Sequence, residues 1–343
     1  MIKASRRTLA RLAAAMLLSA GSVGITAEES SAQDLTKINL ALLTVPGIWD
    51  AGVFAAVDHG FFKDEGLELS FVSPTTPADG LKLLASGNVH FATAHSTEVI
   101  VARSKGLDVV SIATNHQFGT AGIMVPAKAG VTSLKQLEGM TLGVTGIPYN
   151  KVMLEYSLQQ AGVDLSKVEI VTVGFTPMPL LLTERIHGLG DAITWSEPAM
   201  YNVQLGESAD STSTYTYFAF YENGVPRYYT LGVVAAASTL ANDPELARRF
   251  LRAWTKGLDW AIKNQAAAIE GLRQHAPELN EAEAKANLAE IARISQSPDT
   301  EAHGLGWQDV NVWAAQEKFM REHGLIEAEV DVTKAVSNDY QPQ

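Results

Sequence analysis

Aromatic and polar side chains recur in this sequence where strands are predicted to end and helices to begin. Trp49 and Asp50, for example, follow a predicted opening strand over residues 38–43. Helix N-termini present free N–H donors, aromatic faces suit a flat ring, and carboxylates accept N–H bonds from an amino-substituted heterocycle. Each residue taken alone also fits a core or rim position. Together they predict a ligand-binding site made of Trp49, Asp50, His95, Ser96, Thr97, His116, Thr145, Gly146, Trp195 and Glu197.

No catalytic or metal-binding pattern accompanies these residues. The sequence lacks the G-x-S-x-G, Walker A, G-x-G-x-x-G and H-E-x-x-H patterns. His90 and His95 lie on either side of a predicted change from strand to helix, so they do not share a face. The absence of cysteine excludes structural disulfides, thiolate zinc sites and cysteine nucleophiles. We therefore expect a binding protein rather than an enzyme, with no catalytic residue, no metal and no cofactor.

Strands and helices must alternate to position this site. Leu67, Leu69 and Phe71 alternate with polar residues, which predicts a half-buried strand. Asp243 and Pro244 are a cap and a first-turn proline, and they predict the start of a long amphipathic helix. Strands are predicted over 38–43, 67–72, 89–94, 109–114, 122–125, 142–144, 168–173, 192–195 and 229–236. Helices are predicted to end near Gly60 and at His187, to begin at Tyr149, and to cover 77–86, 133–137, 282–294 and 307–323, with another from a Ser96 or Thr97 cap to Arg103.

This alternation predicts an α/β fold with mainly parallel sheets, which place ligands at the C-terminal ends of their strands. A chain of 343 residues is long enough for two lobes with separate cores. We predict a first lobe over 33–119, a second lobe over 120–228 and a return to the first lobe, with the C-terminal helices, over 229–343. Segments 84–92 and 185–193 share a layout of helix end, glycine turn, polar residue and strand, which indicates two related lobes.

Residues 1–32 have the composition of an export signal. Basic residues precede an apolar run over 12–20 that is too short to span a bilayer. Small residues over 30–32 offer a cleavage site, with Ala27 as the alternative, and a pair of arginines at 6 and 7 leaves both the general and the twin-arginine routes open. Cleavage after residue 32 removes four bases and two acids and takes the net charge from −12 to −14. This charge argues against nucleic acid and anionic membranes as partners, and we expect no membrane anchor.

The stretch GFFKDEGLELSFV over 60–72 is a helix end, a turn closed by Gly66 and a strand. With the flanking strand and helix, it resembles the N-terminal part of solute-binding proteins that serve ABC importers, in the thiamine-precursor-synthase-like family of pyrimidine-precursor, sulfonate and nitrate binders. The resemblance runs from about Ile38 to Tyr340. It implies the type II periplasmic binding protein fold, in which two doubly wound lobes enclose a ligand cleft. It also implies a monomer that delivers its ligand to an ABC permease and, through it, to the ATPase subunit.

The same resemblance bears on the ligand. The segment Trp195-Ser196-Glu197-Pro198-Ala199 resembles a family segment that lines the cleft, and the C-terminal region resembles that of the pyrimidine-precursor binders. The loop over 44–50 departs from the Trp-x-Pro-Asn-x-x-His pattern of those binders and matches it only at Pro46. The expected ligand is a flat nitrogen heterocycle such as a thiamine pyrimidine precursor.

Three alternatives remain open at this point. The ligand can be an alkanesulfonate, taurine or nitrate, and Arg185 and Arg227 are the arginines placed to bind such an anion; riboflavin or another aromatic compound is a further option. An enzyme of the pyrimidine-synthase type shares the expected fold, but those synthases carry a cysteine-rich motif that this chain lacks. A sensory domain would have to act through a membrane partner.

Export is directly testable. The basic and then apolar N-terminus predicts a mature form that begins near Gln33 and lies in the periplasm. Cell fractionation with N-terminal sequencing checks this expectation, and a full-length protein confined to the cytoplasm would contradict it.

Overall fold

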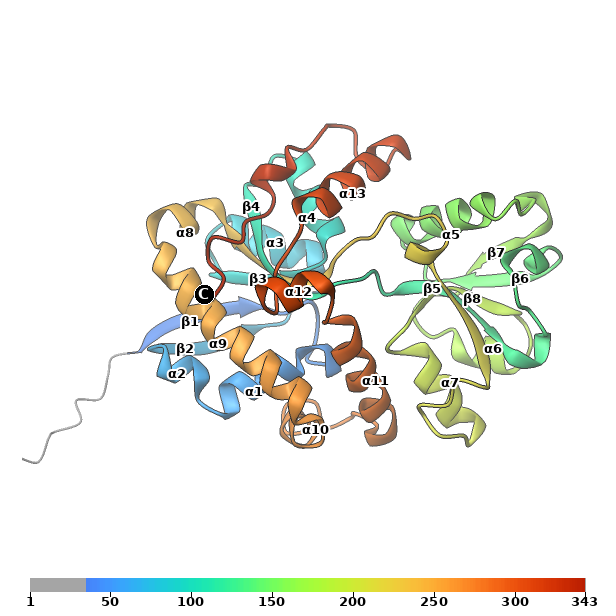
Figure 1. The fold of residues 1–343 in the computed structure, drawn as a ribbon, viewed down its shortest axis with the longest axis horizontal. Helices are drawn as coiled ribbons and strands as arrows, with labels where there is room; N and C mark the ends of the chain where they lie inside the picture. The colour runs from blue at the N-terminus through green and yellow to red at the C-terminus, as the bar shows by residue number, and fades with distance from the viewer. Residues whose placement is uncertain (1–34, 343) are drawn as a thin grey trace, which may run out of the picture. The chain divides into compact units, whose positions relative to one another are not determined.

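The computed structural model describes residues 35–342. The predicted export signal over 1–32 lies outside the described residues. Two five-stranded sheets organise these residues, and helices cover them (Figure 1). The predicted α/β class is confirmed. The predicted lobe boundaries at 119/120 and 228/229 stay a prediction.

The first sheet has the strand order β2-β1-β3-β10-β4. Strand β1 pairs in parallel with β2 and β3, whereas β10 runs antiparallel to β3 and β4. The sheet is therefore mainly parallel, as the sequence predicts, and β10 is the single antiparallel strand because it enters the sheet from the opposite end. The bounds are β1 Thr36–Ala41, β2 Leu67–Val72, β3 Phe91–Ala94, β4 Val109–His116 and β10 Thr230–Ala236.

The second sheet repeats this arrangement in the order β7-β6-β8-β5-β9. Here β6 pairs in parallel with β7 and β8, and β5 is the strand that runs antiparallel to its neighbours β8 and β9. The patterns of apolar residues did not predict β9. The bounds are β5 Ala121–Pro126, β6 Thr141–Val144, β7 Glu169–Thr172, β8 Gly188–Ile193 and β9 Tyr215–Ala219.

Helices cover both faces of each sheet because successive strand residues point to opposite sides. Leu40 and Phe91 belong to one core cluster of the first sheet, and their neighbours Ala41 and Ala92 belong to another. The α-helices are α1 Ala51–Asp58, α2 Phe61–Asp64, α3 Pro77–Ala85, α4 Ser96–Ser104, α5 Pro148–Gln160, α6 Met178–Leu182, α7 Glu197–Leu205, α8 Ala237–Asn242, α9 Pro244–Lys263, α10 Gln265–Leu272, α11 Glu281–Ile294, α12 Pro298–His303 and α13 Val310–Glu322.

Three predicted boundaries are corrected by local hydrogen bonds and turns. The cap of α4 is His95 rather than Ser96 or Thr97, because the Glu98 carboxylate accepts the His95 N–H at 2.9 Å. Helix α6 ends at Leu182, not at His187. Strand β8 ends at Ile193, so Trp195 lies in the turn before α7.

The predicted internal repeat exists, but its register differs by four residues. The ring nitrogen Nδ1 of His90 accepts the Asn39 N–H of β1 at 3.0 Å, and that of His187 accepts the Thr141 N–H of β6 at 2.9 Å. These histidines lie 97 positions apart in the chain rather than the 101 expected. Glu184, with φ of 59°, stands where the first sheet has Gly87, with φ of 74°. The glycine-based alignment failed because a glutamate holds this left-handed turn.

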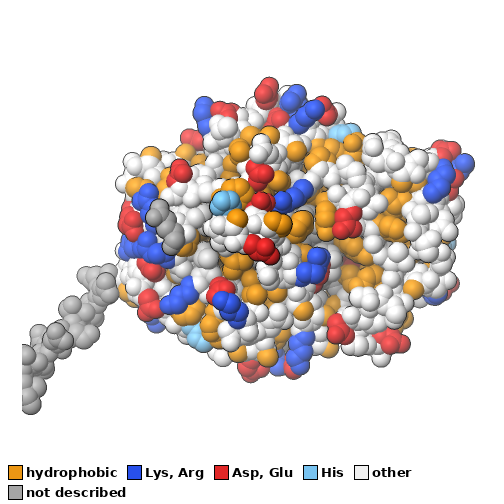
Figure 2. Space-filling view, in the orientation of Figure 1, with side chains coloured by type: hydrophobic (Ala, Val, Ile, Leu, Met, Phe, Trp, Pro, Cys, Tyr) orange, Lys and Arg blue, Asp and Glu red, His pale blue; other side chains and the backbone are white. Residues whose placement is uncertain are grey.

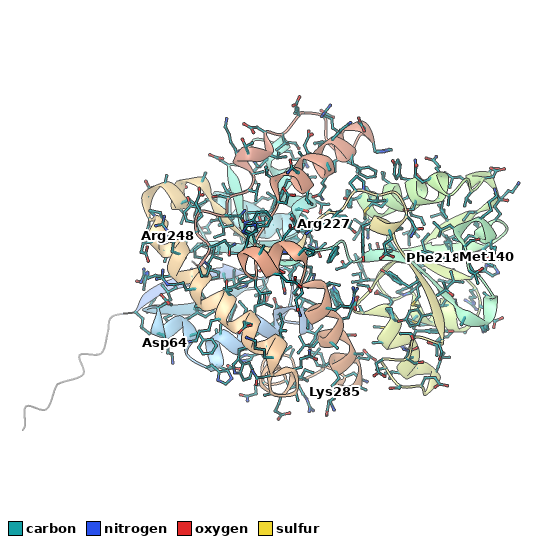
Figure 3. All side chains as sticks on the ribbon, viewed as in Figure 1. Asp64, Met140, Phe218, Arg227, Arg248 and Lys285 are labelled. Atoms are coloured by element: carbon teal, nitrogen blue, oxygen red, sulfur yellow. The ribbon has the colours of Figure 1, made fainter. Side chains whose placement is uncertain are left out.

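Two segments join the sheets: one connects β4 to β5, and the other leads back to β10. The Arg227 guanidinium ties them together, since it donates to the Gln117 carbonyl at 2.8 Å and to the Gln117 side-chain oxygen at 3.1 Å. It also pairs with Asp299 at 3.0 Å and lies over the ring of Phe118. Figure 3 labels Arg227. The crossings that the sequence predicts near 118–122 and 227–229 therefore meet at one arginine.

Helix α13 contacts the layers of both sheets. Its Met320 packs in a cluster of the first sheet, and its Phe319 packs in a cluster of the second. The Phe319 ring meets the Tyr156 ring of α5 edge-on, with centroids 5.1 Å apart. Helix α13 thus lies in the segment that the sequence assigns to the first lobe, but it packs against hydrophobic clusters of both sheets.

Replacement of Arg227 with alanine tests this junction. Gln117 is fully buried, so the substitution leaves two buried acceptors without their charged donor. We expect the free energy of unfolding to fall by about 2 to 4 kcal/mol in urea titrations. Arg248→Ala is the matched control, because Arg248 makes an exposed ion pair with Glu245 and should change the stability by less than about 1 kcal/mol (Figure 3). Equal losses in both variants would contradict the assignment.

Candidate functional site

A small pocket opens at the edge of the first sheet where β3 and β4 end and β10 begins. Trp49 and Asp50 line it from a 3-10 turn before α1, and α9 contributes Trp254 and Leu258. The lining residues are Trp49, Asp50, Gly52, Val53, Thr93, Asn115, Leu231, Gly232, Val233, Trp254 and Leu258. The pocket therefore lies at strand ends, where the sequence predicts a ligand-binding site.

Trp195 of the second sheet's layer meets Trp49 of the first. Their ring centroids lie 5.5 Å apart, with 46° between the planes. Gly47 is required here, because a Cβ on this residue would lie 2.4 Å from the Trp49 ring. The contact brings together two of the predicted site residues, one near each sheet.

His116 adjoins the same pair of rings. Its ring centroid lies 6.4 Å from that of Trp195, and its Nδ1 shares a hydrogen bond of 3.0 Å with the Thr230 hydroxyl. Burial lowers the pKa of His116 to about 3, with a smaller contribution from His95, so the imidazole is neutral at physiological pH. It is a buried strand residue rather than a solvated loop histidine.

Three ring nitrogens in this group are buried and lack a hydrogen-bond partner within residues 35–342: Nε1 of Trp49, Nε1 of Trp195 and Nε2 of His116. Buried polar atoms are normally hydrogen-bonded, so such orphans require an explanation. Two are fixed donors, since an indole nitrogen only donates. A ligand with acceptors at its edge would satisfy them.

Two carboxyl groups flank the tryptophan pair. Asp50 accepts the Gly47 N–H at 3.1 Å, and Glu197 accepts the Ile193 N–H at 2.8 Å. Burial raises the pKa of Asp50 to about 7 despite the Gly47 bond, and burial likewise raises the pKa of Glu197 to about 7. Near neutral pH each carboxyl group is therefore partly protonated, and it can accept a hydrogen bond when ionised or donate one when protonated.

The other predicted site residues have bonding partners within the fold. The Ser96 hydroxyl donates to the Tyr229 carbonyl, and the Thr97 hydroxyl donates to Glu98. The Thr145 amide and hydroxyl both donate hydrogen bonds to the Asp191 carboxylate. Gly146 is exposed and has a φ of 92°. None of these four residues lines the pocket, so their part in ligand binding stays a prediction.

His95 acts on the pocket through Leu231. Its Nδ1 accepts the Leu231 N–H at 2.9 Å, and Leu231 has a left-handed φ of 57°. Such strain in a residue other than glycine concentrates at functional sites. No sequence pattern marked Leu231, because left-handed geometry is predicted only where glycine or asparagine stands.

Sequence reasoning also missed Thr93, Asn115, Gly232 and Trp254. Asn115 follows directly from the predicted end of its strand, so its place at the sheet edge was the available signal. Trp254 was expected in the core, and it lies there, but one side of it also lines the pocket.

The described part of the chain contains no cluster of three or more potential metal-ligating side chains. Among the same residues, no helix combines the length and the apolar character that a membrane span requires.

Comparisons with known proteins agree on one group. The profile of the family described as NMT1/THI5 like matches residues 50–268. A formylaminopyrimidine-binding protein of Halalkalibacterium halodurans is 29% identical, over 90% of this chain and 92% of its own length. The riboflavin-binding protein RibY of Chloroflexus aurantiacus is 28% identical, over 90% and 87%.

Two further matches add an enzyme and a solved structure. A 4-amino-5-hydroxymethyl-2-methylpyrimidine phosphate synthase of Saccharomyces cerevisiae is 23% identical, over 71% of this chain and 72% of its own. The periplasmic aliphatic sulphonate binding protein SsuA of Escherichia coli superposes with a TM-score of 0.68 at 13% identity, over 90% and 94%. The fold is thus that of periplasmic binding proteins.

The raised pKa of Asp50 makes a prediction about stability. Between about pH 4 and pH 7 the unfolded chain loses this proton before the folded chain does, so the free energy of unfolding falls as the pH rises. Asp50→Asn removes this loss. The stability difference between variant and wild type should therefore grow in favour of the variant from pH 5 to pH 8, by at most about 3 kcal/mol. Urea titrations without ligand measure it, and the effect of His116 cancels because both proteins carry it.

Glu197→Gln should behave in the same direction. Asp79→Asn should show no change in its stability difference between pH 5 and pH 8, because hydrogen bonds from Thr76 and Lys82 lower the pKa of Asp79 and this carboxyl is ionised in both the folded and the unfolded chain throughout that range. A difference for Asp50→Asn that is the same at both pH values would contradict the burial argument.

Proposed function

Because the chain belongs to the NMT1/THI5-like family, we propose that it is the periplasmic solute-binding component of an ABC importer and that its ligand is a flat nitrogen heterocycle. The single observation that carries the ligand class is the Trp49–Trp195 contact, with two orphan indole N–H donors and a carboxyl group on each side. It supports a planar ring with hydrogen-bonding edges.

An aminopyrimidine suits this arrangement. The tryptophan faces can stack on the ring, and the indole N–H groups and the neutral His116 can form hydrogen bonds with ring nitrogens. Asp50 and Glu197 can accept hydrogen bonds from the exocyclic amino group. The relative named for formylaminopyrimidine supports the same choice, and the relative named for riboflavin makes a larger flat heterocycle the second candidate.

Sulfonates, taurine and nitrate fit less well. An anion needs cationic or amide donors, and no lysine or arginine lines the described pocket. Arg185, which the sequence placed near a cleft edge, is exposed and precedes β8, at the end of the strand away from Trp195. Arg227 is engaged at the crossings.

An enzymatic role is the weaker alternative. The yeast relative is named a synthase, but both relatives of higher identity are named as binding proteins. This chain has no cysteine, and the lining of the described pocket supplies aromatic faces and hydrogen-bonding groups. As a binder the protein would act as a monomer, close its two lobes on the ligand, and pass it to a permease and the attached ATPase subunit.

Calorimetric titration with formylaminopyrimidine, riboflavin and ethanesulfonate tests the ligand class. Trp195→Ala should weaken binding of the heterocycle by at least about tenfold, because it removes stacking and buried area. Glu197→Gln should weaken an amino-heterocycle by roughly ten- to a hundredfold and leave a sulfonate unchanged or improved. Trp260→Ala is the matched control, since Trp260 packs on His59 away from the pocket. Tight sulfonate binding with no heterocycle binding would overturn the proposal.

A further inference from the structure

Leu231 has a backbone conformation that is unusual for a strand residue. It lies within β10, and the residues on both sides of it pair with β4, yet its φ is 57°. Strand residues normally have a negative φ, and a left-handed conformation brings the Cβ of any residue other than glycine too close to a main-chain carbonyl oxygen. The leucine backbone is therefore strained at this position.

Hydrogen bonds from the start of α4 hold this segment in place. The Nδ1 of His95 accepts the Leu231 N–H at 2.9 Å, and the main-chain N–H of His95 donates to the Glu98 carboxylate. The amide and the hydroxyl of Ser96 both donate to the Tyr229 carbonyl oxygen, at 3.3 Å and 2.7 Å. A strained conformation persists only where the surrounding structure fixes it in this way.

The leucine side chain requires an explanation, because glycine would adopt this conformation without strain. Core packing does not provide it, since Leu231 belongs to none of the four core clusters found among residues 35–342, whereas Val233 and Val234 of the same strand do. Leu231 is 5% exposed, so it is also not one of the apolar side chains that form the surface shown in Figure 2. What remains is the pocket, which Leu231 lines together with Gly232 and Val233.

We propose that Leu231 is a specificity-determining residue of this pocket and that His95 is the positioning residue that holds it there. The leucine side chain forms a fixed apolar wall, which packs against a small flat ring and obstructs a larger one. The inference rests on the proposed function and deepens it, because it assigns the site to single-ring heterocycles of the pyrimidine kind rather than to fused three-ring compounds such as riboflavin.

The fixed backbone is what makes this wall selective. A leucine in a relaxed loop can shift with its backbone when a larger ligand enters, whereas Leu231 would have to break its hydrogen bond to His95. A ring that fits gains the apolar area that it buries against the leucine. A larger ring would leave a buried N–H without its acceptor, so it is rejected by an unfavourable change rather than by a weaker fit.

Leu231→Gly removes the wall and relieves the strain. Calorimetric titrations with formylaminopyrimidine and riboflavin give the ratio of the two affinities. We expect the preference for formylaminopyrimidine over riboflavin to fall by at least about tenfold, because the small ring loses its contact and the larger ring gains space. Leu231→Ala, which also shortens the side chain, should change the ratio in the same direction.

Glu184→Gly is the matched control. Within residues 35–342, Glu184 is the other residue besides glycine with a left-handed φ, at 59°, and it is exposed in the turn before β8. Its replacement relieves the same kind of strain outside the pocket lining. The ratio of the two affinities should therefore stay within about twofold of the wild-type ratio.

The role of His95 is tested by its dependence on Leu231. His95→Ala should weaken formylaminopyrimidine binding by at least about tenfold in the wild-type chain but by less than about threefold in Leu231→Gly, because glycine needs no partner to hold this conformation. His95→Asn should keep most of the affinity, since the asparagine oxygen can accept the same N–H. Equal losses from His95→Ala in both chains would overturn the positioning role.

Stability without ligand separates this inference from the proposed function. If Leu231 serves the pocket, Leu231→Gly should lower the melting temperature by less than about half as much as Leu40→Gly, which removes a buried core leucine of β1. A loss as large as that of Leu40→Gly, or an unchanged affinity ratio, would overturn the inference. If neither compound binds the wild type while Leu231→Gly keeps its stability, the proposed heterocycle class falls and the assignment of Leu231 to the pocket stands.

Discussion

The hydrogen bonds of Gln117 are the constraint on which the rest of the site depends. Its amide donates to Ile294, its side chain donates to Trp307, and its two oxygens accept from Arg227. Ser297 supplies a further donor to the side-chain oxygen at 3.1 Å. Because His116 is the preceding residue, this fixed glutamine sets where the imidazole stands and where Trp195 meets it. The C-terminal helices thus hold the strand end from which the site is built.

Much of this architecture follows from local sequence patterns. Alternating apolar residues gave the strands, and the rule that ligands lie at strand ends selected Trp49, Asp50, His116, Trp195 and Glu197, which the fold brings together around the tryptophan contact. Local rules could not foresee partners distant in the chain. Thr145 was predicted to bind a ligand because no residue near it in the sequence indicates its hydrogen bond to Asp191, which lies 46 residues away. Leu231 was missed because its strained backbone depends on His95, 136 residues away.

The site also shows where binding and stability oppose each other. Burial raises the pKa of both Asp50 and Glu197 to about 7, so each ionised carboxylate is held there at a cost to the folded state. Three ring nitrogens without partners add to that cost. A protein selected for stability alone would have no reason to keep these groups. Their presence together at one pocket indicates that these residues serve ligand binding rather than stability.

Helix α13 has a consequence for how this chain can be divided. Residues 121–222 hold all five strands of the second sheet, yet Phe319 fills part of that sheet's hydrophobic cluster from nearly a hundred residues further along. A fragment excised at the two crossings would leave Tyr156 and its apolar neighbours uncovered, and such a patch promotes self-association. The reciprocal fragment would leave Phe319 facing solvent. Residues 121–222 should therefore not fold as an independent domain, although they contain all five strands of the second sheet.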